Sequence, residues 1–210
     1  MQRSRRGLGF AALVLCAITG CSNPTETRNS VPSSSAKPTL RQVDDAGVRL
    51  PFDTKFPDRW NQANNGTRYE PCTALLPTEL ARLGVDATSV RDAAGTNAQT
   101  LRGCEWAYRG TEVPARWFVS QFVGNSVGLE EDKRKKSSET YVWLPDVRIS
   151  GRTAGVHYTA SGRYCVTYVQ SGRAAVNTMV SVSGRTPPPP SKICDRALAF
   201  TRATIGKMPL

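Results

Sequence analysis

The C-terminal third of the chain repeats the tripeptide Ser-Gly-Arg four times at nearly regular spacing. Its glycines, 11, 10 and 12 residues apart, are Gly151, Gly162, Gly172 and Gly184. Glycine adopts the positive φ that tight hairpin turns require. Alternating β-branched and aromatic residues fill the intervals, and such runs between regular turn signals indicate an antiparallel meander. The pattern predicts strands over residues 156–160, 164–169 and 175–182.

The same pattern places the four arginines that follow these glycines. Successive turns of a meander lie at opposite ends of the sheet, so Arg152 and Arg173 are expected at one end. Arg163 and Arg185 are then expected at the other. Arginines at turn tips are usually solvated, and we predict that for all four.

Further elements precede and follow the meander. Strands are predicted over residues 104–108 and 116–123, and a short helix over residues 77–84, where Pro77 begins the helix and Gly84 lies just beyond it. In residues 128–137 acids precede bases, the order that complements a helix dipole, and this favours a short, solvated helix over a functional basic patch.

A last helix is predicted over residues 193–205. Its expected buried positions are Ile193, Leu198, Ala199 and Ile205. The predicted fold class is therefore α+β, a single antiparallel β-sheet with a C-terminal meander and helices packed mainly on one face.

The N-terminus has the layout of an export signal. Three arginines precede an apolar run over residues 8–17 that is too short to span a bilayer. Ile18-Thr19-Gly20-Cys21 then matches the bacterial lipobox, in which the cysteine thiol takes a diacylglycerol and becomes the first mature residue. We expect lipid attachment at Cys21, with export by the general route favoured and the twin-arginine route still open.

Composition divides the chain into four parts. Residues 1–20 are the predicted lipoprotein signal peptide, and residues 21–40, rich in Ser, Thr and Pro, are predicted to be the lipidated cysteine and a flexible tether. Residues 41–67 form an irregular lead-in segment that we expect to pack on the domain through its aromatic residues. Residues 68–210 form the α+β domain.

Four cysteines remain after the signal peptide and the lipobox: Cys72, Cys104, Cys165 and Cys194. In an exported chain they indicate two disulfides, for which three connectivities are possible. Sequence order favours pairing the first two and the last two, closing loops of about 30 residues that are worth roughly 3–4 kcal/mol each. Zinc binding is disfavoured because no pair has the short spacing of structural zinc ligands.

The net charge of the chain limits the classes of binding partner that we expect. Residues 21–210 hold 25 basic and 17 acidic residues, a net charge of +8. A basic surface could lie near anionic lipid headgroups or wall phosphates, although scattered solvated charge is the favoured interpretation. The lipid anchor makes the membrane a partner, whereas an exported chain without a binding motif is not expected to bind nucleic acid.

Recognisable catalytic chemistry is missing from the sequence. His157, the only histidine, lies in the middle of a predicted strand and is expected to be a surface or packed residue. We find no nucleophile elbow, no metal-binding histidine motif and no redox cysteine pair, so we expect no cofactor, no metal site and no catalytic residue. The four tryptophans are assigned to the core rather than to a sugar site.

Several short motifs follow one another in a familiar order: Tyr69-Glu70-Pro71-Cys72, Gly103-Cys104-Glu105-Trp106, Tyr164-Cys165-Val166 and Cys194-Asp195-Arg196-Ala197. Together with the lipobox, they resemble an actinobacterial lipoprotein family of uncharacterised function that includes the mycobacterial lipoproteins LprB and LprC. The resemblance covers residues 68–210, with one departure where Lys192-Ile193 replaces the Asp-Pro expected before the last cysteine. It implies a mycobacterium-like envelope and brings no catalytic residues.

These observations favour a non-enzymatic binding or interaction module that is anchored at the outer face of the plasma membrane. Two alternatives stay open: an enzyme acting on cell-wall glycan or lipid through carboxylates, and an accessory subunit of an envelope complex. The sheet face opposite the helices should discriminate among ligands. An apolar cavity there would indicate a lipid, a polar groove a glycan, and a flat surface a protein.

Overall fold

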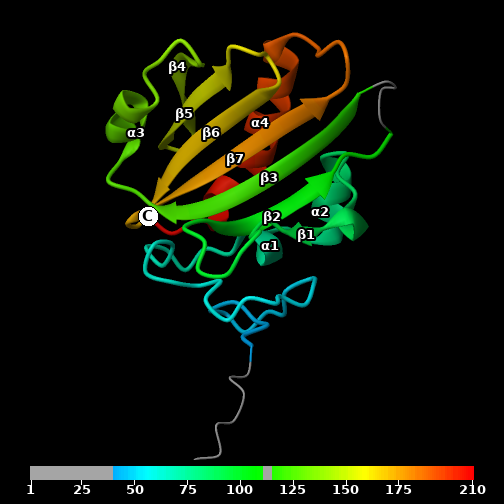
Figure 1. The fold of residues 1–210 in the computed structure, drawn as a ribbon, viewed down its shortest axis with the longest axis vertical. Coiled ribbons are helices and arrows are strands. Elements are labelled where there is room, and N and C mark those ends of the chain that lie inside the picture. Colours follow the sequence, from blue (N-terminus) through cyan, green and yellow to red (C-terminus); the bar gives the residue numbers. More distant parts are fainter. Residues whose placement is uncertain (1–39, 111–114) are drawn as a thin grey trace, which may run out of the picture. The chain divides into compact units, whose positions relative to one another are not determined.

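Seven antiparallel strands of the described chain form one sheet in the order β1-β2-β3-β7-β6-β5-β4 (Figure 1). The computed structural model describes residues 40–110 and 115–210, so the predicted signal peptide, Cys21 and the tether before residue 40 lie outside the described residues. The strands are β1 (Arg91–Asp92), β2 (Arg102–Ala107), β3 (Arg116–Asn125), β4 (Tyr141–Ile149), β5 (Arg152–Thr159), β6 (Tyr164–Ser171) and β7 (Ala174–Ser183).

The predicted meander is confirmed. Strands β4 to β7 follow one another as antiparallel neighbours, and all three strands expected between the Ser-Gly-Arg turns are present. The four turn glycines have φ angles between 57° and 138°, so each uses the freedom that only glycine has without strain. Strand β4, which pairs with β5 across the first turn, is an element that the sequence reading did not identify.

Strand β3 enters the sheet beside β7 rather than beside β4, its successor in the chain. Its ten residues pair with β7 from Arg116 opposite Ser183 to Asn125 opposite Ala174. The connection from β3 to β4 therefore passes over the sheet, and it carries helix α3 (Leu129–Lys135). In Figure 1 this helix lies beside β4 and β5.

The other helices lie on the opposite face of the sheet. They are α1 (Pro71–Ala74), α2 (Pro77–Arg82) and α4 (Pro190–Thr204), with short 3₁₀ turns η1 (Ala87–Ser89) and η2 (Ile205–Lys207). Helix α4 packs on β6 and β7, and one apolar cluster joins Leu80 of α2, Trp106 of β2 and Phe200 of α4. The predicted α+β class with helices mainly on one face is confirmed.

The buried side of α4 differs in part from the prediction. Ile193 and Ile205 are buried as expected, but Leu198 and Ala199 are only half-buried. Ala197 and Phe200 take the central positions, where Phe200 packs 5.7 Å from the Trp106 ring, measured between centroids. The helix is thus rotated by about one residue relative to the predicted stripe.

Two disulfides connect helices to strands. Cys72 of α1 is bonded to Cys104 of β2, and Cys165 of β6 to Cys194 of α4, with Cα–Cα distances of 5.3 and 5.0 Å. This is the pairing that sequence order favours. The second disulfide fastens α4 to the centre of the meander.

Two turn arginines, Arg152 and Arg163, correct the expectation that all four are solvated, because both are half-buried. Arg152 is half-buried, and its guanidinium donates to the carbonyl oxygens of Ile205 and Met208 at 3.0 and 2.8 Å and also to that of Gln170. The carbonyls at a helix C-terminus lack intrahelical donors, and the Arg152 guanidinium supplies a donor to Ile205 and Met208. Arg152 therefore fastens the C-terminal end of the chain to the meander.

Candidate functional site

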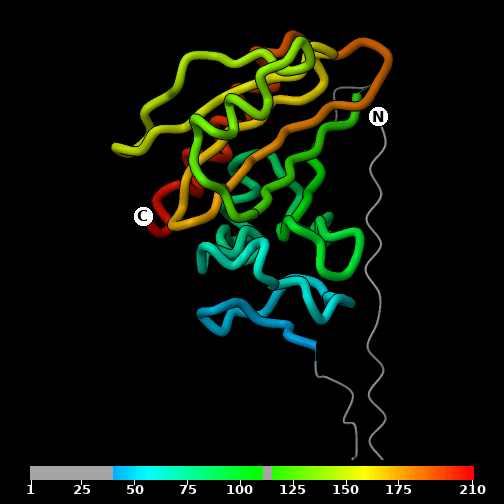
Figure 2. The backbone as a smooth tube through the Cα atoms, turned by 60° about the vertical axis from the view of Figure 1, so that its left-hand side comes forward, coloured from blue at the N-terminus to red at the C-terminus, as the bar shows by residue number. Residues whose placement is uncertain are grey.

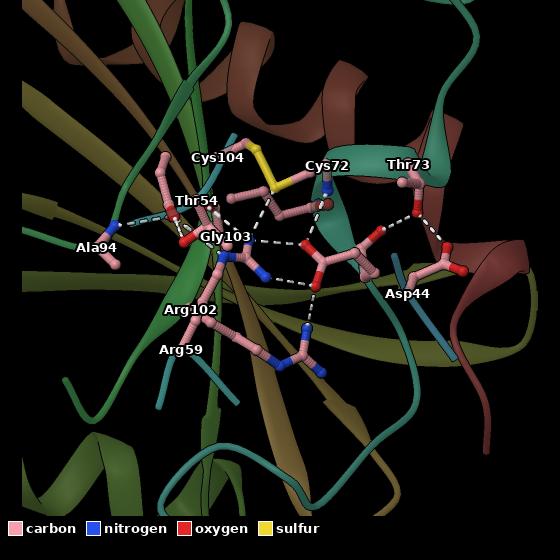
Figure 3. The surroundings of a disulfide bond; sticks show 12 residues. Asp44, Thr54, Arg59, Cys72, Thr73, Ala94, Arg102, Gly103 and Cys104 are labelled. Carbon is pink, nitrogen blue, oxygen red and sulfur yellow. Dashed lines mark hydrogen bonds and ion pairs between the residues drawn. A yellow bond between two sulfur atoms is a disulfide. The ribbon is translucent and has the colours of Figure 1, made fainter. Parts of the chain in front are cut away.

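A buried cluster of four charged side chains surrounds the Cys72–Cys104 disulfide (Figure 3). Arg59 of the lead-in segment makes a two-pronged contact with the Glu70 carboxylate, at 2.9 and 3.0 Å. Arg102 reaches the same carboxylate at 2.9 Å, and Asp92 accepts from Arg59 Nε at 3.2 Å. All four groups are engaged with one another, which makes this cluster a structural one.

The pKa values of the two arginines respond differently to this environment. Burial alone lowers the pKa of Arg59, but the hydrogen bond and charge of Glu70, together with Asp92, outweigh burial and raise it. Burial dominates at Arg102 and lowers its pKa, since it shares Glu70 with a second cation. Glu70 is therefore the anion on which both buried cations depend.

His157 lies on the sheet face opposite α4, enclosed by aromatic rings. Its ring centroid is 4.6 Å from that of Trp143 and 5.4 Å from that of Tyr141, and the residue is 2% exposed. Neither ring nitrogen has a hydrogen-bond partner, and burial followed by the charge of Lys136 lowers its pKa to about 4. The packed interpretation of His157 is confirmed.

The tryptophans do not form a sugar platform. Trp106 and Trp117 are buried in the core, as predicted. Trp143 packs against His157, and Trp60 lies between the guanidinium groups of Arg41 and Arg59, at 4.1 and 4.5 Å from their Cζ atoms. Both are half-buried, and Trp60 also packs against the main core cluster.

A groove of about 800 Å³ opens on the sheet face that α4 leaves uncovered. Small residues and amides of β3, β6 and β7 form its floor, and α3 forms one wall. Its lining residues are Leu101, Gly124, Asn125, Ser126, Val127, Glu131, Asp132, Lys135, Lys136, Gln170, Gly172, Arg173, Ala175 and Asn177. It is therefore a polar groove with cations on both sides, and none of its lining residues is aromatic.

Two small residues make the hollow. Gly124 of β3 pairs with Ala175 of β7, so no large side chain rises from the centre of the floor. A Cβ at Gly124 would come within 2.4 Å of the Leu101 side chain, which means that glycine lets Leu101 lie directly against the strand. Leucine thereby contributes an apolar strip to an otherwise polar lining.

Most polar groups of the groove are already engaged. Asn125 donates to the Gln62 carbonyl at 2.7 Å, and Gln170 both accepts from the Tyr168 hydroxyl at 2.6 Å and donates to Gly172 at 2.9 Å. Burial raises the pKa of that Tyr168 hydroxyl. Asn177 differs, because its Oδ1 is buried without any partner.

The charged residues of the groove are likewise mostly paired, with one exception. Asp132 pairs with Lys136 at 2.9 Å, and Glu131 pairs with Arg134 and, at 3.5 Å, with Lys135. These carboxylates come from adjacent positions of one helix, so no second carboxylate faces them across the groove among its lining residues. The exposed Arg173 on the far side has no ion-pair partner in the described part of the chain. Arg173 and Asn177 are thus the groups left for a ligand.

Sequence patterns alone do not predict this site. They locate the helix of residues 128–137 and the turn at Arg173 but indicate solvated surface for both. The structure brings them together because the β3–β4 connection passes over the sheet. Within residues 40–110 and 115–210, no cluster of His, Cys, Asp or Glu could hold a metal ion. None of the helices in those ranges has the length and apolarity needed to cross a membrane.

Comparisons with known proteins place the chain in a family but not in a function. No curated protein sequence matches it. A solved structure that matches is described as the immunity protein TplEi of T6SS from Pseudomonas aeruginosa complexed with "L" peptide. The match has 14% identity and a TM-score of 0.29 and covers 62% of this chain and 61% of that one, so the likeness carries no argument about function. The model of the family described as protein of unknown function (DUF3558) matches residues 16–207, and the chain therefore belongs to the DUF3558 family.

Proposed function

We propose that this protein is a cell-envelope lipoprotein, held at the outer face of the plasma membrane through Cys21, whose domain binds a glycan in the groove. The DUF3558 match supports its place in an uncharacterised family. The finer assignment to the actinobacterial lipoproteins that include LprB and LprC is part of this proposal and rests on the motif order. The anchor rests on the lipobox.

The groove carries the argument for binding. Its volume of about 800 Å³ lies in the range of small-ligand sites. Most of its lining residues are amides or charged residues of both signs, which suits a hydroxyl-rich ligand better than a lipid. Arg173 can hold a carboxylate through its planar guanidinium, and the Asn177 side chain lines the same groove. A glycan with a carboxylate fits this pair of groups.

The same lining argues for binding without chemistry. Glycoside hydrolysis uses two carboxyl groups on opposite sides of the scissile bond, about 5–9.5 Å apart. The two groove carboxylates, Glu131 and Asp132, both rise from α3 and are both paired with basic residues of that helix. We therefore propose no catalytic role for the groove.

Removing the groove cation tests the ligand assignment. The full chain, purified in detergent, is titrated with a peptidoglycan fragment that contains muramic acid and, separately, with neutral chitohexaose. We expect the acidic fragment to bind more tightly and Arg173→Gln to weaken its binding about tenfold, since one charge-assisted contact is worth about 1.4 kcal/mol.

The matched control is Arg68→Gln, which removes another exposed arginine that does not line the groove. It should leave the affinity unchanged. Equal binding by the Arg173→Gln variant, or no saturable binding of either glycan, would contradict the proposal. Release of shorter fragments during the titration would support the enzymatic alternative instead.

The anchor has its own test. Mass spectrometry of the N-terminal peptide of the mature protein should find a diacylglycerol on Cys21. The Cys21→Ala variant should leave the membrane fraction of fractionated cells, because the two acyl chains supply the attachment. A wild-type protein that is processed without lipid would exclude the anchor and leave the groove proposal standing.

A further inference from the structure

Basic side chains from four separate elements gather at one end of the sheet. Arg116 begins β3, Arg163 lies in the β5–β6 turn, Arg185 follows β7, and Lys192 lies in the first turn of α4. We call these four residues the basic end. Strands β3 and β7 run from the basic end, at Arg116 and Ser183, to the opposite end of the sheet, at Asn125 and Ala174. Arg173 and the groove floor lie at that opposite end.

Contacts between the four elements hold the basic end together. Arg163 Nη1 donates to the Gly184 carbonyl at 2.8 Å, which brings the β5–β6 turn against the residue before Arg185. Arg116 stands opposite Ser183 in the β3–β7 register. Pro190 at the start of α4 packs on Gly162. A Cβ on Gly162 would lie 3.6 Å from the Cγ of Pro190. The cations are therefore neighbours through the fold, although they lie far apart in the sequence.

Three cations of the basic end are exposed to solvent. Arg116, Arg185 and Lys192 are exposed, and none has an acidic partner within the described ranges. Beside them Arg196 stacks on Trp117 and Tyr108, with its Cζ 4.2 and 4.6 Å from the ring centroids. The neighbouring acid on α4 is Asp195. Several like charges this close create a positive potential that attracts a polyanion.

We propose that the basic end binds a phosphate-bearing anionic polymer of the cell wall. Three of its four cations are arginines, whose planar guanidinium forks match phosphate oxygens better than lysine does. Cations spaced along several turns suit a repeating anion more than a single small ion. A polymer also gains affinity by occupying several of these sites at once.

The lead-in segment and the basic end lie at opposite ends of the domain. Arg59 of that segment donates to the Gly103 carbonyl, and Gly103 stands opposite Phe122 near the end of β3. Arg116 begins the same ten-residue strand, which spans about 30 Å. Figure 2 shows the lead-in segment and the turn after β7 at opposite ends of this unit.

The proposed anchor at Cys21 would hold the domain in the cell envelope. The choice of a wall polymer over a lipid headgroup rests on that proposed envelope location, and the vesicle measurement below distinguishes the two sources.

The test uses the full chain in detergent with long-chain polyphosphate as the probe. The variant Arg116→Gln, Arg185→Gln, Lys192→Gln removes three exposed charges, and we expect its affinity to fall at least tenfold. The matched control Arg49→Gln, Arg68→Gln, Arg82→Gln removes the same net charge from other exposed positions and should lose less than threefold. Binding should also weaken steeply as salt rises.

Each outcome decides the proposal. Equal losses in the two triple variants would mean that only net charge matters, and would overturn a localised site. Tighter binding to vesicles of phosphatidylglycerol and phosphatidylcholine, with the same dependence on the basic end, would assign the surface to the membrane instead. Arg173→Gln should bind polyphosphate normally, so failure of the groove proposal and failure of this one can be told apart.

Discussion

Replacing Glu70 by glutamine is expected to lower the free energy of unfolding by about 3–5 kcal/mol, the usual result of removing one partner from a buried ion pair. The side chains of Arg59, Arg102 and Glu70 are each at most 2% exposed. Without the Glu70 charge, Arg59 keeps Asp92 as an ion-pair partner, but Arg102 loses its ion pair. Water cannot reach them to compensate.

Urea unfolding followed by circular dichroism at pH 7 measures this loss. Glu79→Gln is the matched control, because Glu79 also pairs with one cation, Lys207 at 2.8 Å, but at a partly exposed position. That change should cost far less than Glu70→Gln, because solvent screens an exposed ion pair. A Glu70→Gln variant that is as stable as the control would show that the cluster contributes little to folding.

The cluster also explains how the lead-in segment joins the domain. Arg59 Nη2 donates to Sγ of Cys72 at 3.1 Å and to the Gly103 carbonyl at 3.3 Å, so one side chain contacts both sides of the first disulfide. Asp44 accepts from Thr73 of α1 at 2.6 Å and adds a second polar link (Figure 3). The predicted packing of this segment through aromatic residues is also present, because Phe52 and Trp60 pack against the main core cluster as well as around Arg59.

Such a buried arginine is hard to foresee because hydropathy patterns assign charged residues to the surface. The meander was predictable for the opposite reason. Each of its turns depends on a glycine at positive φ, and each strand carries local alternation, so the signal lies within about 12 residues. The disulfides followed from sequence order because each connects elements that are close in the chain.

The groove depends on contacts that no local pattern reveals. Its floor requires β3 to pair with β7, residues that are about 50 positions apart in the chain. Its wall requires α3 to cross the sheet, and Gly155 of β5 permits this because the Leu129 side chain packs where a Cβ would stand. A run of acids followed by bases looks like a solvated helix in the sequence whether or not it closes a groove.

Acid is expected to destabilise the protein through His157. The folded-state pKa of about 4 lies below the ordinary value of 6.5, so the unfolded chain takes up the proton first as pH falls. The stability that depends on neutral His157 is therefore complete above about pH 6.5 and is lost progressively between pH 6.5 and pH 4. The full shift corresponds to about 3 kcal/mol, and screening by solvent near α3 reduces the expected loss to about 2 kcal/mol.

His157→Phe isolates this contribution, because phenylalanine keeps a ring between Tyr141 and Trp143 but cannot take a proton. Urea unfolding at several pH values should give the variant a shallower dependence between pH 6.5 and pH 4, while the carboxylates contribute equally to both proteins. The variant should also be at least as stable at pH 7, since neither imidazole nitrogen has a partner to lose. Parallel pH profiles for the two proteins would mean that His157 is protonated as readily in the folded state as in the unfolded state. Protonation of His157 should loosen the contact between α3 and β5. We therefore expect the wild-type protein to release its groove ligand between pH 6.5 and pH 4 and the variant to retain it. That result would connect the buried His157 ring to the groove wall.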